Sequence, residues 1–214
     1  MKIFAFSGLG VDERVFENLK IDCDLIHLPW LDFSPKMNLE DYAKSYKELL
    51  PEGEKFGVLG LSFGGLMAVE LTKIVKPEFC ILISSAETYH DLPHVYRRFG
   101  QFGIHKLLPA SFFIPPFFMA NYFFKPKDKS LLAQILKDSD PKFNKWAMHN
   151  LLTWSNEVRL KNVLKIHGTK DKLIPFPKDK ATVPVEKAGH FMIHNQANEL
   201  SGIINKYLLN TKES

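Results

Sequence analysis

A serine flanked by glycines stands in the segment Gly60-Leu61-Ser62-Phe63-Gly64. The apolar run 55–59 before it predicts a strand, and residues 66–76 after it predict a helix. In a strand–turn–helix context, G-x-S-x-G lifts a serine hydroxyl above a sheet, because residues without a β-carbon avoid the clashes of so tight a turn. The chemistry favoured is nucleophilic attack by Ser62. The alternatives are a structural glycine turn or an anion-binding helix N-terminus.

A serine hydroxyl is a weak nucleophile, so an imidazole must accept its proton and a carboxylate must orient that imidazole. In this turn family the order along the chain is serine, acid, histidine. Asp171 follows the apolar run 163–167, and His190 lies in the loop after residues 182–185. All three side chains then follow the carboxyl ends of expected parallel strands, where they can converge. The sequence therefore predicts a catalytic set of Ser62, Asp171 and His190.

Rival assignments exist for both partners of the serine. Asp171 is also a common turn former, and Asp91, just past the apolar run 79–84, is the reserve acid. His194, at the start of the last expected helix, is the competitor for the base. His167, just before the acid turn, is expected to pack against the core. The remaining histidines fall on the wrong strand or between the sheet strands: His27, His90, His94, His105 and His149.

A tetrahedral oxyanion needs two N–H donors, one after the nucleophile and one in the loop after an early strand. The run Ile3–Phe6 ends in Ser7-Gly8-Leu9-Gly10, whose glycines allow the N–H of Leu9 to turn toward the site. The predicted oxyanion donors are therefore the backbone N–H groups of Leu9 and Phe63. A nucleotide-binding turn is disfavoured because the third glycine and a phosphate-loop lysine are absent from these residues.

The elements that must position these groups are short apolar runs alternating with helix-period segments. The continuous apolar character of the runs indicates strands buried on both faces, hence a parallel sheet between helices. Helical stripes cover residues 39–50, with Asn38 as N-cap, and residues 200–208. The predicted fold class is α/β, a three-layer sandwich with a mostly parallel sheet of about six strands. The expected strands are 3–6, 25–28, 56–60, 79–84, 163–167 and 182–185.

The alternation stops at about 87–157, a segment that we predict to be a helical lid insertion across the carboxyl edge of the sheet. Two helices are expected in it, at 130–137 and 142–155, the second preceded by Asp140-Pro141. Eight of the chain's 18 phenylalanines fall between residues 99 and 124. The alternative is that these aromatics only pack the insertion onto the body. The candidate substrate-binding residues are Phe99, Phe102, Phe117, Phe118 and Trp154.

The bulk composition is that of one globular domain spanning 1–214, with 45% hydrophobic and 24% charged residues. The net charge is +4 without a Lys/Arg block, so no nucleic-acid partner is expected. The apolar run at 3–6 is too short for a signal sequence or a membrane span, and a cytoplasmic location is expected. Two cysteines exclude a framework of several disulfides.

The four segments together resemble the α/β-hydrolase superfamily, over nearly the whole chain apart from the insertion. The matching stretches are 7–10, 60–65, 167–171 and 188–190. The resemblance implies a sheet that starts late, without the family's first two antiparallel strands. The family's oxyanion loop often begins with His-Gly, whereas Ser7 precedes Gly8 here, a departure that bears on how the loop is braced.

The expected function is a serine hydrolase that cleaves a carboxylic ester, or a related acyl bond, of a small and largely apolar substrate. The acyl-enzyme route requires no metal and no organic cofactor. An alternative within the same fold is a thioesterase or lyase acting on an acidic or acyl-coenzyme A substrate. Its signal is a positive rim, which could equally be a solvated face: Arg97, Arg98, Lys125, Lys127 and Lys129. A non-catalytic binding protein of this fold is the third hypothesis, against which the complete Ser, Asp and His set argues.

Overall fold

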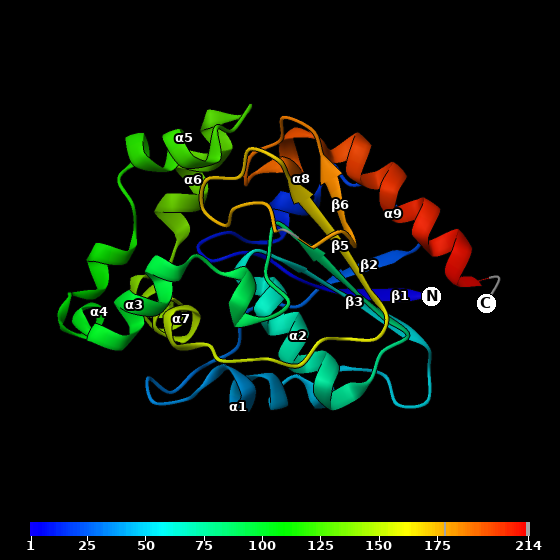
Figure 1. The fold of residues 1–214 in the computed structure, drawn as a ribbon, viewed down its shortest axis with the longest axis horizontal. Helices are drawn as coiled ribbons and strands as arrows, with labels where there is room; N and C mark the ends of the chain where they lie inside the picture. The colour runs from blue at the N-terminus through cyan, green and yellow to red at the C-terminus, as the bar shows by residue number, and fades with distance from the viewer. Residues whose placement is uncertain (178, 213–214) are drawn as a thin grey trace.

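The computed structural model describes residues 1–177 and 179–212. Six parallel strands form one sheet in the order β2-β1-β3-β4-β5-β6 (Figure 1). The prediction of an α/β fold with a mostly parallel sheet of about six strands is confirmed. The strands are β1 Lys2–Phe6, β2 Asp24–His27, β3 Phe56–Leu61, β4 Phe79–Ile83, β5 Val163–Gly168 and β6 Thr182–Val185.

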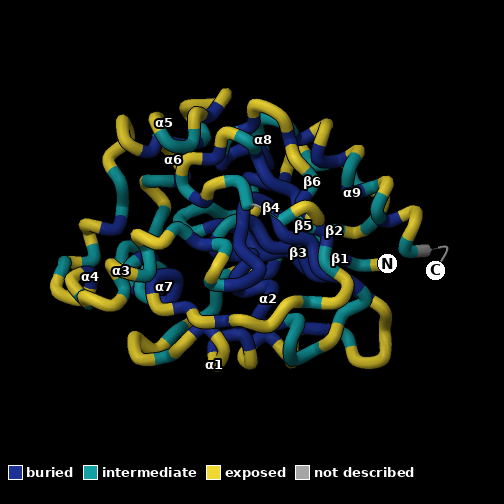
Figure 2. The backbone as a smooth tube through the Cα atoms, viewed as in Figure 1, coloured by how far each residue is buried: buried dark blue, intermediate teal, exposed yellow. Residues whose placement is uncertain are grey.

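Helices cover both faces of the sheet, giving three layers (Figure 1). On one face lie α1 (Leu39–Lys44) and α2 (Phe63–Val75), and on the other lie α8 (Met192–Asn195), α9 (Ala197–Lys212) and the 3₁₀ turn Glu13–Phe16. Side chains of β1 alternate between the two cores, with Phe4 and Phe6 facing α2 and Ile3 and Ala5 facing α9. Figure 2 shows the strands as the buried centre of the molecule. This double burial explains why the strands read as continuous apolar runs.

The first helix is shorter than its apolar stripe indicates. Helix α1 ends at Lys44, and a separate 3₁₀ turn covers Lys47–Leu49. Asn38 caps the helix as predicted, its Oδ1 accepting from the N–H of Asp41 at 2.7 Å. The hydroxyls of Tyr42 and Tyr46 donate to the carbonyls of Leu31 and Pro29, both at 2.9 Å. These bonds join the segment to the loop after β2. The bond of Tyr46, which follows the end of α1, fixes the chain there by a tertiary contact.

A mainly helical segment connects β4 to β5 and lies beyond the carboxyl ends of the strands (Figure 1). The predicted helices 130–137 and 142–155 correspond to α6 and α7, and Asp140 Oδ1 caps α7 by accepting from the N–H of Lys142 at 2.8 Å. Across the described residues, none of the helices combines the length and apolar character needed to cross a bilayer. The elements are the 3₁₀ turn Tyr89–Asp91, α3 His94–Phe102, α4 Ile104–Leu107, the 3₁₀ turn Ala110–Phe113, α5 Phe117–Phe124, α6 Lys129–Asp138 and α7 Pro141–Thr153.

Candidate active site

Ser62 occupies the turn between β3 and α2, with φ 53° and ψ −120°. A positive φ at a residue with a side chain costs about 1–3 kcal/mol and persists only where surrounding contacts impose it. Those contacts come from the end of β4. The N–H of Ser62 donates to the carbonyl of Ile83 at 2.9 Å, and Ser85 Oγ donates to the carbonyl of Ser62 at 2.6 Å. The turn therefore holds the serine in a strained, raised conformation.

Glycines surround this turn because backbone segments meet there without room for a β-carbon. A Cβ at Gly60 would lie 2.3 Å from the carbonyl oxygen of Gly64. One at Gly64 would lie 2.2 Å from the carbonyl oxygen of Ser7, and one at Gly65 would lie 2.1 Å from Ser85 Oγ. The first two contacts are with backbone atoms that cannot swing aside. The glycines of the sequence motif are therefore required by packing, independently of any reaction.

Gly64→Ala is expected to lower the free energy of unfolding by about 1–3 kcal/mol or more, because the added methyl group meets the β1 backbone. The matched control is Gly202→Ala in α9, where a Cβ meets nothing within 4 Å. There the same substitution should stabilise the protein by about 0.5–1 kcal/mol, since alanine is the better helix former. Urea unfolding of both variants measures the difference. Equal effects at the two positions would contradict the packing role of Gly64.

Three side chains converge at the carboxyl edge of the sheet. Asp171 lies on the turn after β5 and His190 in the loop after β6, while Ser62 follows β3. His190 Nε2 lies 2.8 Å from Ser62 Oγ, and His190 Nδ1 lies 2.7 Å from Asp171 Oδ2. The structure thus joins the three residues that the sequence singled out in one hydrogen-bonded chain. Contacts in this order could let a histidine accept the proton of a serine nucleophile while a carboxylate orients the histidine.

The Asp171 carboxylate is buried and fully hydrogen-bonded. Its Oδ1 accepts from the N–H groups of Leu173 at 2.9 Å and Ile174 at 3.0 Å. Burial alone would raise the pKa of Asp171, but hydrogen bonds to His167 and His190 outweigh it, so the pKa lies well below its ordinary value. Asp171 therefore stays ionised and can hold the Nδ1 proton of His190.

His167 is a second neighbour of the acid that the sequence reasoning did not assign to the site. It is buried, as predicted, and its Nε2 donates to the carbonyl of Ile174 at 2.7 Å. The same nitrogen lies 3.2 Å from Asp171 Oδ2. His167 thus fixes both the acid and the turn that carries it. No signal in the sequence marked this contact, because it depends on how the turn after β5 folds back onto the strand end.

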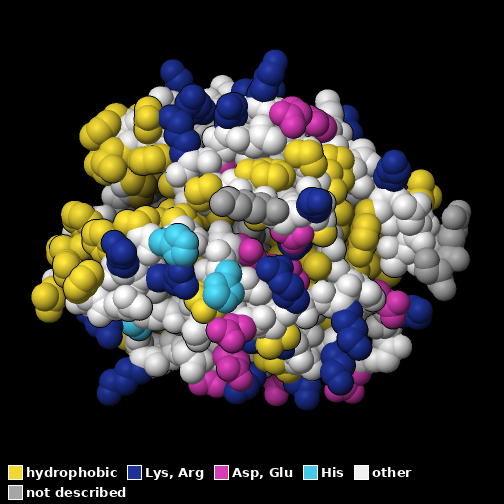
Figure 3. Space-filling view, in the orientation of Figure 1, with side chains coloured by type: hydrophobic (Ala, Val, Ile, Leu, Met, Phe, Trp, Pro, Cys, Tyr) yellow, Lys and Arg dark blue, Asp and Glu magenta, His cyan; other side chains and the backbone are white. Residues whose placement is uncertain are grey.

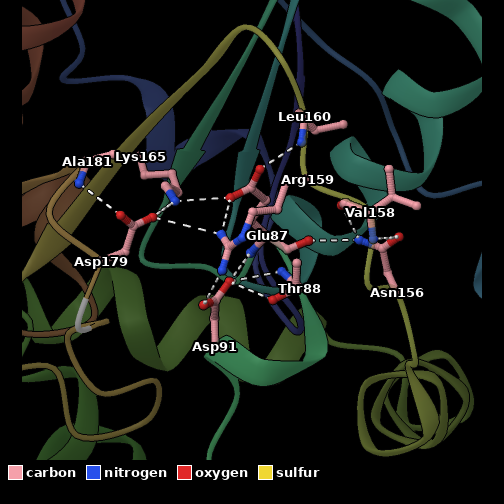
Figure 4. A network of polar contacts seen from close by, with 10 residues as sticks. All are labelled: Glu87, Thr88, Asp91, Asn156, Val158, Arg159, Leu160, Lys165, Asp179 and Ala181. Atoms are coloured by element: carbon pink, nitrogen blue, oxygen red, sulfur yellow. Dashed lines mark hydrogen bonds and ion pairs between the residues drawn. The ribbon is translucent and has the colours of Figure 1, made fainter.

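Asp91, the reserve acid, is committed elsewhere. Its Oδ2 accepts from the N–H of Glu87 at 3.2 Å and from the N–H of Thr88 at 2.9 Å, which caps the 3₁₀ turn after β4. Figure 4 shows Asp91 within a charged network in which the Glu87 carboxylate accepts from Arg159 at 2.8 Å and Lys165 at 3.0 Å. A hollow of about 910 Å³ borders this network. Because these charges pair with one another, we interpret the network as one that stabilises the fold.

The competing histidine does not hold the position of the base. Among the ring nitrogens, it is His190 Nε2 that lies against Ser62 Oγ. The ring of His194 instead stacks on Phe191, with a centroid separation of 5.5 Å. His190, and not His194, is therefore the histidine in contact with Ser62.

The loop after β1 lies beside the nucleophile. A Cβ at Gly8 would be 3.4 Å from Ser62 Cβ, and Leu9 and Phe63 line the same cavity as Ser62. Phe63 is the first residue of α2, so its N–H has no acceptor within the helix. Both residues border the space beside Ser62, and an oxyanion role for their N–H groups is part of the proposal below.

Ser7, which stands where the resembling family often has a histidine, braces this loop. Its Oγ donates to the carbonyl of Val11 at 2.8 Å, closing the loop on itself. From the helical segment, Ser139 Oγ donates to the carbonyl of Gly10 at 3.0 Å. Gly10 has φ 71°, a conformation that favours glycine. Side-chain hydroxyls thus fix the loop through the carbonyl groups of Gly10 and Val11.

A largely apolar cavity of about 460 Å³ opens onto Ser62 and His190. Most of its lining comes from the segment between β4 and β5, and the polar groups in it are few. Such a volume and composition are typical of a small-molecule site. Aromatic residues of the lining are Phe63, Tyr96, Phe99, Phe112, Phe113, Phe123, Phe124 and Phe191.

Of the five candidate substrate-binding residues, the structure places only Phe99 in this lining. Phe102, Phe117 and Phe118 project from the outer surface, 76%, 42% and 71% exposed. Trp154 is buried away from the cavity, and its Nε1 donates to Glu70 Oε1 at 2.8 Å. Composition identified the aromatic segment but not the side of each helix that faces inward.

One side of α5 faces the cavity. Ala120, Phe123 and Phe124 are spaced three and four residues apart, the spacing of one helix face, and all three line the cavity. Phe117 and Phe118 begin the helix and point outward. Phe117 stands three residues before Ala120 and seven before Phe124, so helical spacing alone does not separate it from the cavity-lining residues.

Comparisons with known proteins agree on the fold. No family model matches the chain, and no curated protein sequence matches it. Solved structures do match. A lipase candidate, lip1, from Acinetobacter baumannii AYE superposes with a TM-score of 0.77 at 14% identity, over 99% of this chain and 84% of that one.

Two further structures are similar over nearly all of both chains. A thermophilic esterase from Thermogutta terrifontis has a TM-score of 0.68 at 16% identity, covering 99% of this chain and 90% of its own. The RedJ thioesterase of the prodiginine biosynthetic pathway in Streptomyces coelicolor has a TM-score of 0.67 at 12% identity, covering 97% and 90%. These proteins share the α/β-hydrolase fold, and the present chain has that fold.

Proposed function

We propose that the protein is a serine hydrolase that cleaves carboxylic esters of small, largely apolar substrates. The observation that carries this proposal is the hydrogen-bonded chain from Ser62 through His190 to Asp171, which opens into an apolar cavity. The fold supports this proposal, and the similar structures include an esterase and a lipase candidate.

The proposed reaction begins when Ser62 Oγ attacks the ester carbonyl and passes its proton to His190 Nε2. The carbonyl oxygen becomes an oxyanion, which the N–H groups of Leu9 and Phe63 stabilise. Asp171 holds the Nδ1 proton and so favours the imidazolium that forms. When the intermediate collapses, the alcohol leaves with the proton from His190, and Ser62 carries the acyl group.

Water completes the cycle by the same groups. His190 removes a proton from a water molecule as that water attacks the acyl carbonyl, and the oxyanion again faces Leu9 and Phe63. Collapse breaks the bond to Ser62 Oγ, which recovers its proton from His190 while the carboxylic acid departs. The residues named supply every proton transfer in this sequence.

The substrate class follows from the cavity. Apolar side chains surround the space next to Ser62 and gain most from an acyl or alcohol portion without charge. We further propose that the chain is one domain with a lid insertion at about 87–157. The support is that this segment supplies most of the lining and braces the loop after β1 through Ser139.

A thioesterase acting on an acyl-coenzyme A substrate is the second candidate. It is favoured by the basic residues on the segment that supplies most of the cavity lining and by the thioesterase among the neighbours. Some of those basic groups have protein partners: Lys127 Nζ donates to the carbonyl of Asn195 at 2.6 Å, and the Arg97 guanidinium lies over the ring of Tyr89. Arg98 is exposed, so an anionic group in solution can reach its guanidinium.

A panel of p-nitrophenyl esters and acyl-coenzyme A thioesters with matched acyl chains tests the choice. We expect higher kcat/KM for the esters, increasing with acyl chain length until the cavity is filled. Faster turnover of the thioesters, lost in Arg98→Ala, would replace the esterase assignment with the thioesterase one. Hydrolysis of neither set by folded protein would leave the non-catalytic binding hypothesis.

A further inference from the structure

Exposed large apolar side chains gather on α3, α4, α5 and the 3₁₀ turn before α5. Among the described residues, ten of the fourteen such side chains lie there, and Figure 3 shows apolar atoms concentrated over these helices. Leu107 is 87% exposed. An exposed apolar patch of this kind marks an interaction site. Its members, here called the apolar face, are Val95, Phe99, Phe102, Ile104, Leu107, Phe112, Phe117, Phe118, Met119 and Tyr122.

The charges on the same segment are of one sign. Residues 92–127 contain no Asp or Glu, whereas the whole chain has 24 acidic against 28 basic residues. Within the described part of the chain, the ion pairs involve none of the five cations of this segment. Its positive charge is therefore not neutralised by neighbouring carboxylates. The cations are Arg97, Arg98, Lys106, Lys125 and Lys127.

Apolar side chains projecting among uncompensated cations complement a surface of anionic headgroups over hydrocarbon. Lys and Arg are attracted to the headgroups, and Phe, Leu and Ile side chains enter the acyl boundary. A second copy of the chain is a poorer occupant, because a two-fold contact would place this positive segment against itself. The side chains of Phe102 and Leu107 protrude from their helices. A fluid lipid surface can accept protruding side chains without a complementary shape.

The apolar face continues into the cavity beside the serine. Val95, Phe99, Phe112 and Met119 are each at least 41% exposed, and each also lines that cavity. An uninterrupted apolar path therefore runs from the outer surface of the segment toward Ser62. A docked protein would present the cavity mouth to the lipid, so an apolar substrate could pass to the serine without crossing water.

We propose that residues 92–127 dock the protein peripherally on an anionic lipid surface and that its ester substrates enter from that surface. The docking stands on the exposed side chains and charges of the segment, and the substrate route rests on the function proposed above. The two parts are separable in experiment, because vesicle binding needs no turnover and soluble esters need no vesicle.

The test is co-sedimentation with vesicles of phosphatidylcholine containing phosphatidylglycerol, compared with phosphatidylcholine alone. We expect wild-type protein to bind the anionic vesicles preferentially. The triple variant Phe102→Ser, Leu107→Ser, Phe118→Ser should bind these vesicles at least about tenfold more weakly than wild type. None of these three side chains lines the cavity, so turnover of a soluble p-nitrophenyl ester should be unchanged. The matched control is Leu49→Ser with Leu209→Ser, 49% and 58% exposed on other elements, which should bind like wild type.

A charge-reversal pair keeps the proposal falsifiable if the triple variant does not fold. Arg98→Glu with Lys106→Glu should abolish the preference for anionic vesicles. The control Lys47→Glu with Lys76→Glu, whose residues are also exposed but lie outside the segment 92–127, should retain it. The docking proposal would be overturned if wild-type protein did not co-sediment with anionic vesicles, or if the triple variant bound them as well as wild type. Sedimentation velocity supplies a further outcome: a dimer that the triple variant dissociates would assign the apolar face to self-association instead.

Discussion

Ser62→Ala is expected to lower kcat for ester hydrolysis by on the order of a millionfold, because the acyl group has no oxygen left to bond to. Turnover of the best p-nitrophenyl ester measures the loss. A fluorophosphonate probe gives an independent readout, since it should label one residue in wild-type protein and none in the variant. The Oγ of Ser62 already lies 2.8 Å from the base, so the probe should react without rearrangement of the turn.

Ser62→Gly separates the loss of chemistry from any loss of fold. Glycine adopts the φ of 53° at this position without strain, so this variant should be as inactive as Ser62→Ala. It should also be more stable than the alanine variant by about 1 kcal/mol, which urea unfolding can measure. Labelling of folded Ser62→Ala would show that another nucleophile reacts and would remove the proposed mechanism.

The sheet and the meeting of Ser62, Asp171 and His190 were predictable because each depends on signals local in sequence. Buried parallel strands are continuous apolar runs, and turn residues at their carboxyl ends meet at one edge whatever lies between. Asp171 and His190 are far from Ser62 in sequence, yet strand order alone brings them to it. The elbow glycines added a steric signal that the short distances at Gly60 and Gly64 explain.

The features of the site that the sequence did not reveal depend on tertiary contacts. His167 meets Asp171 only because the turn after β5 folds back, and the hydrogen bond of Ser7 to Val11 depends on the path of its loop. In the helical segment, apolar residues face both the cavity and the solvent, so hydrophobicity does not mark the inner side. Phe102 was expected at the substrate for that reason, although it projects outward.

Asp171→Asn is expected to lower kcat by on the order of ten-thousandfold with little change in KM. The surrounding backbone decides how an amide would lie here. The N–H groups of Leu173 and Ile174 donate to Oδ1 and would keep the amide oxygen there, which turns the amide nitrogen toward His190 Nδ1. That nitrogen is a donor, so the imidazole would carry its proton on Nε2 and could no longer accept one from Ser62. Steady-state kinetics on a p-nitrophenyl ester measure the effect.

Asp91→Asn is the matched control, since it makes the same change in the carboxylate that the sequence offered as the reserve acid. Asp91 accepts from the N–H groups of Glu87 and Thr88, and an amide oxygen can accept both bonds. Ester turnover should therefore stay near the wild-type rate in this variant. The reverse pattern, with activity lost in Asp91→Asn and kept in Asp171→Asn, would place the acid after β4. Although Asp171 is buried, hydrogen bonds to its histidine partners hold its pKa low, so its carboxylate is ionised. This ionised carboxylate is in contact with His190, so we expect the large loss of activity at Asp171.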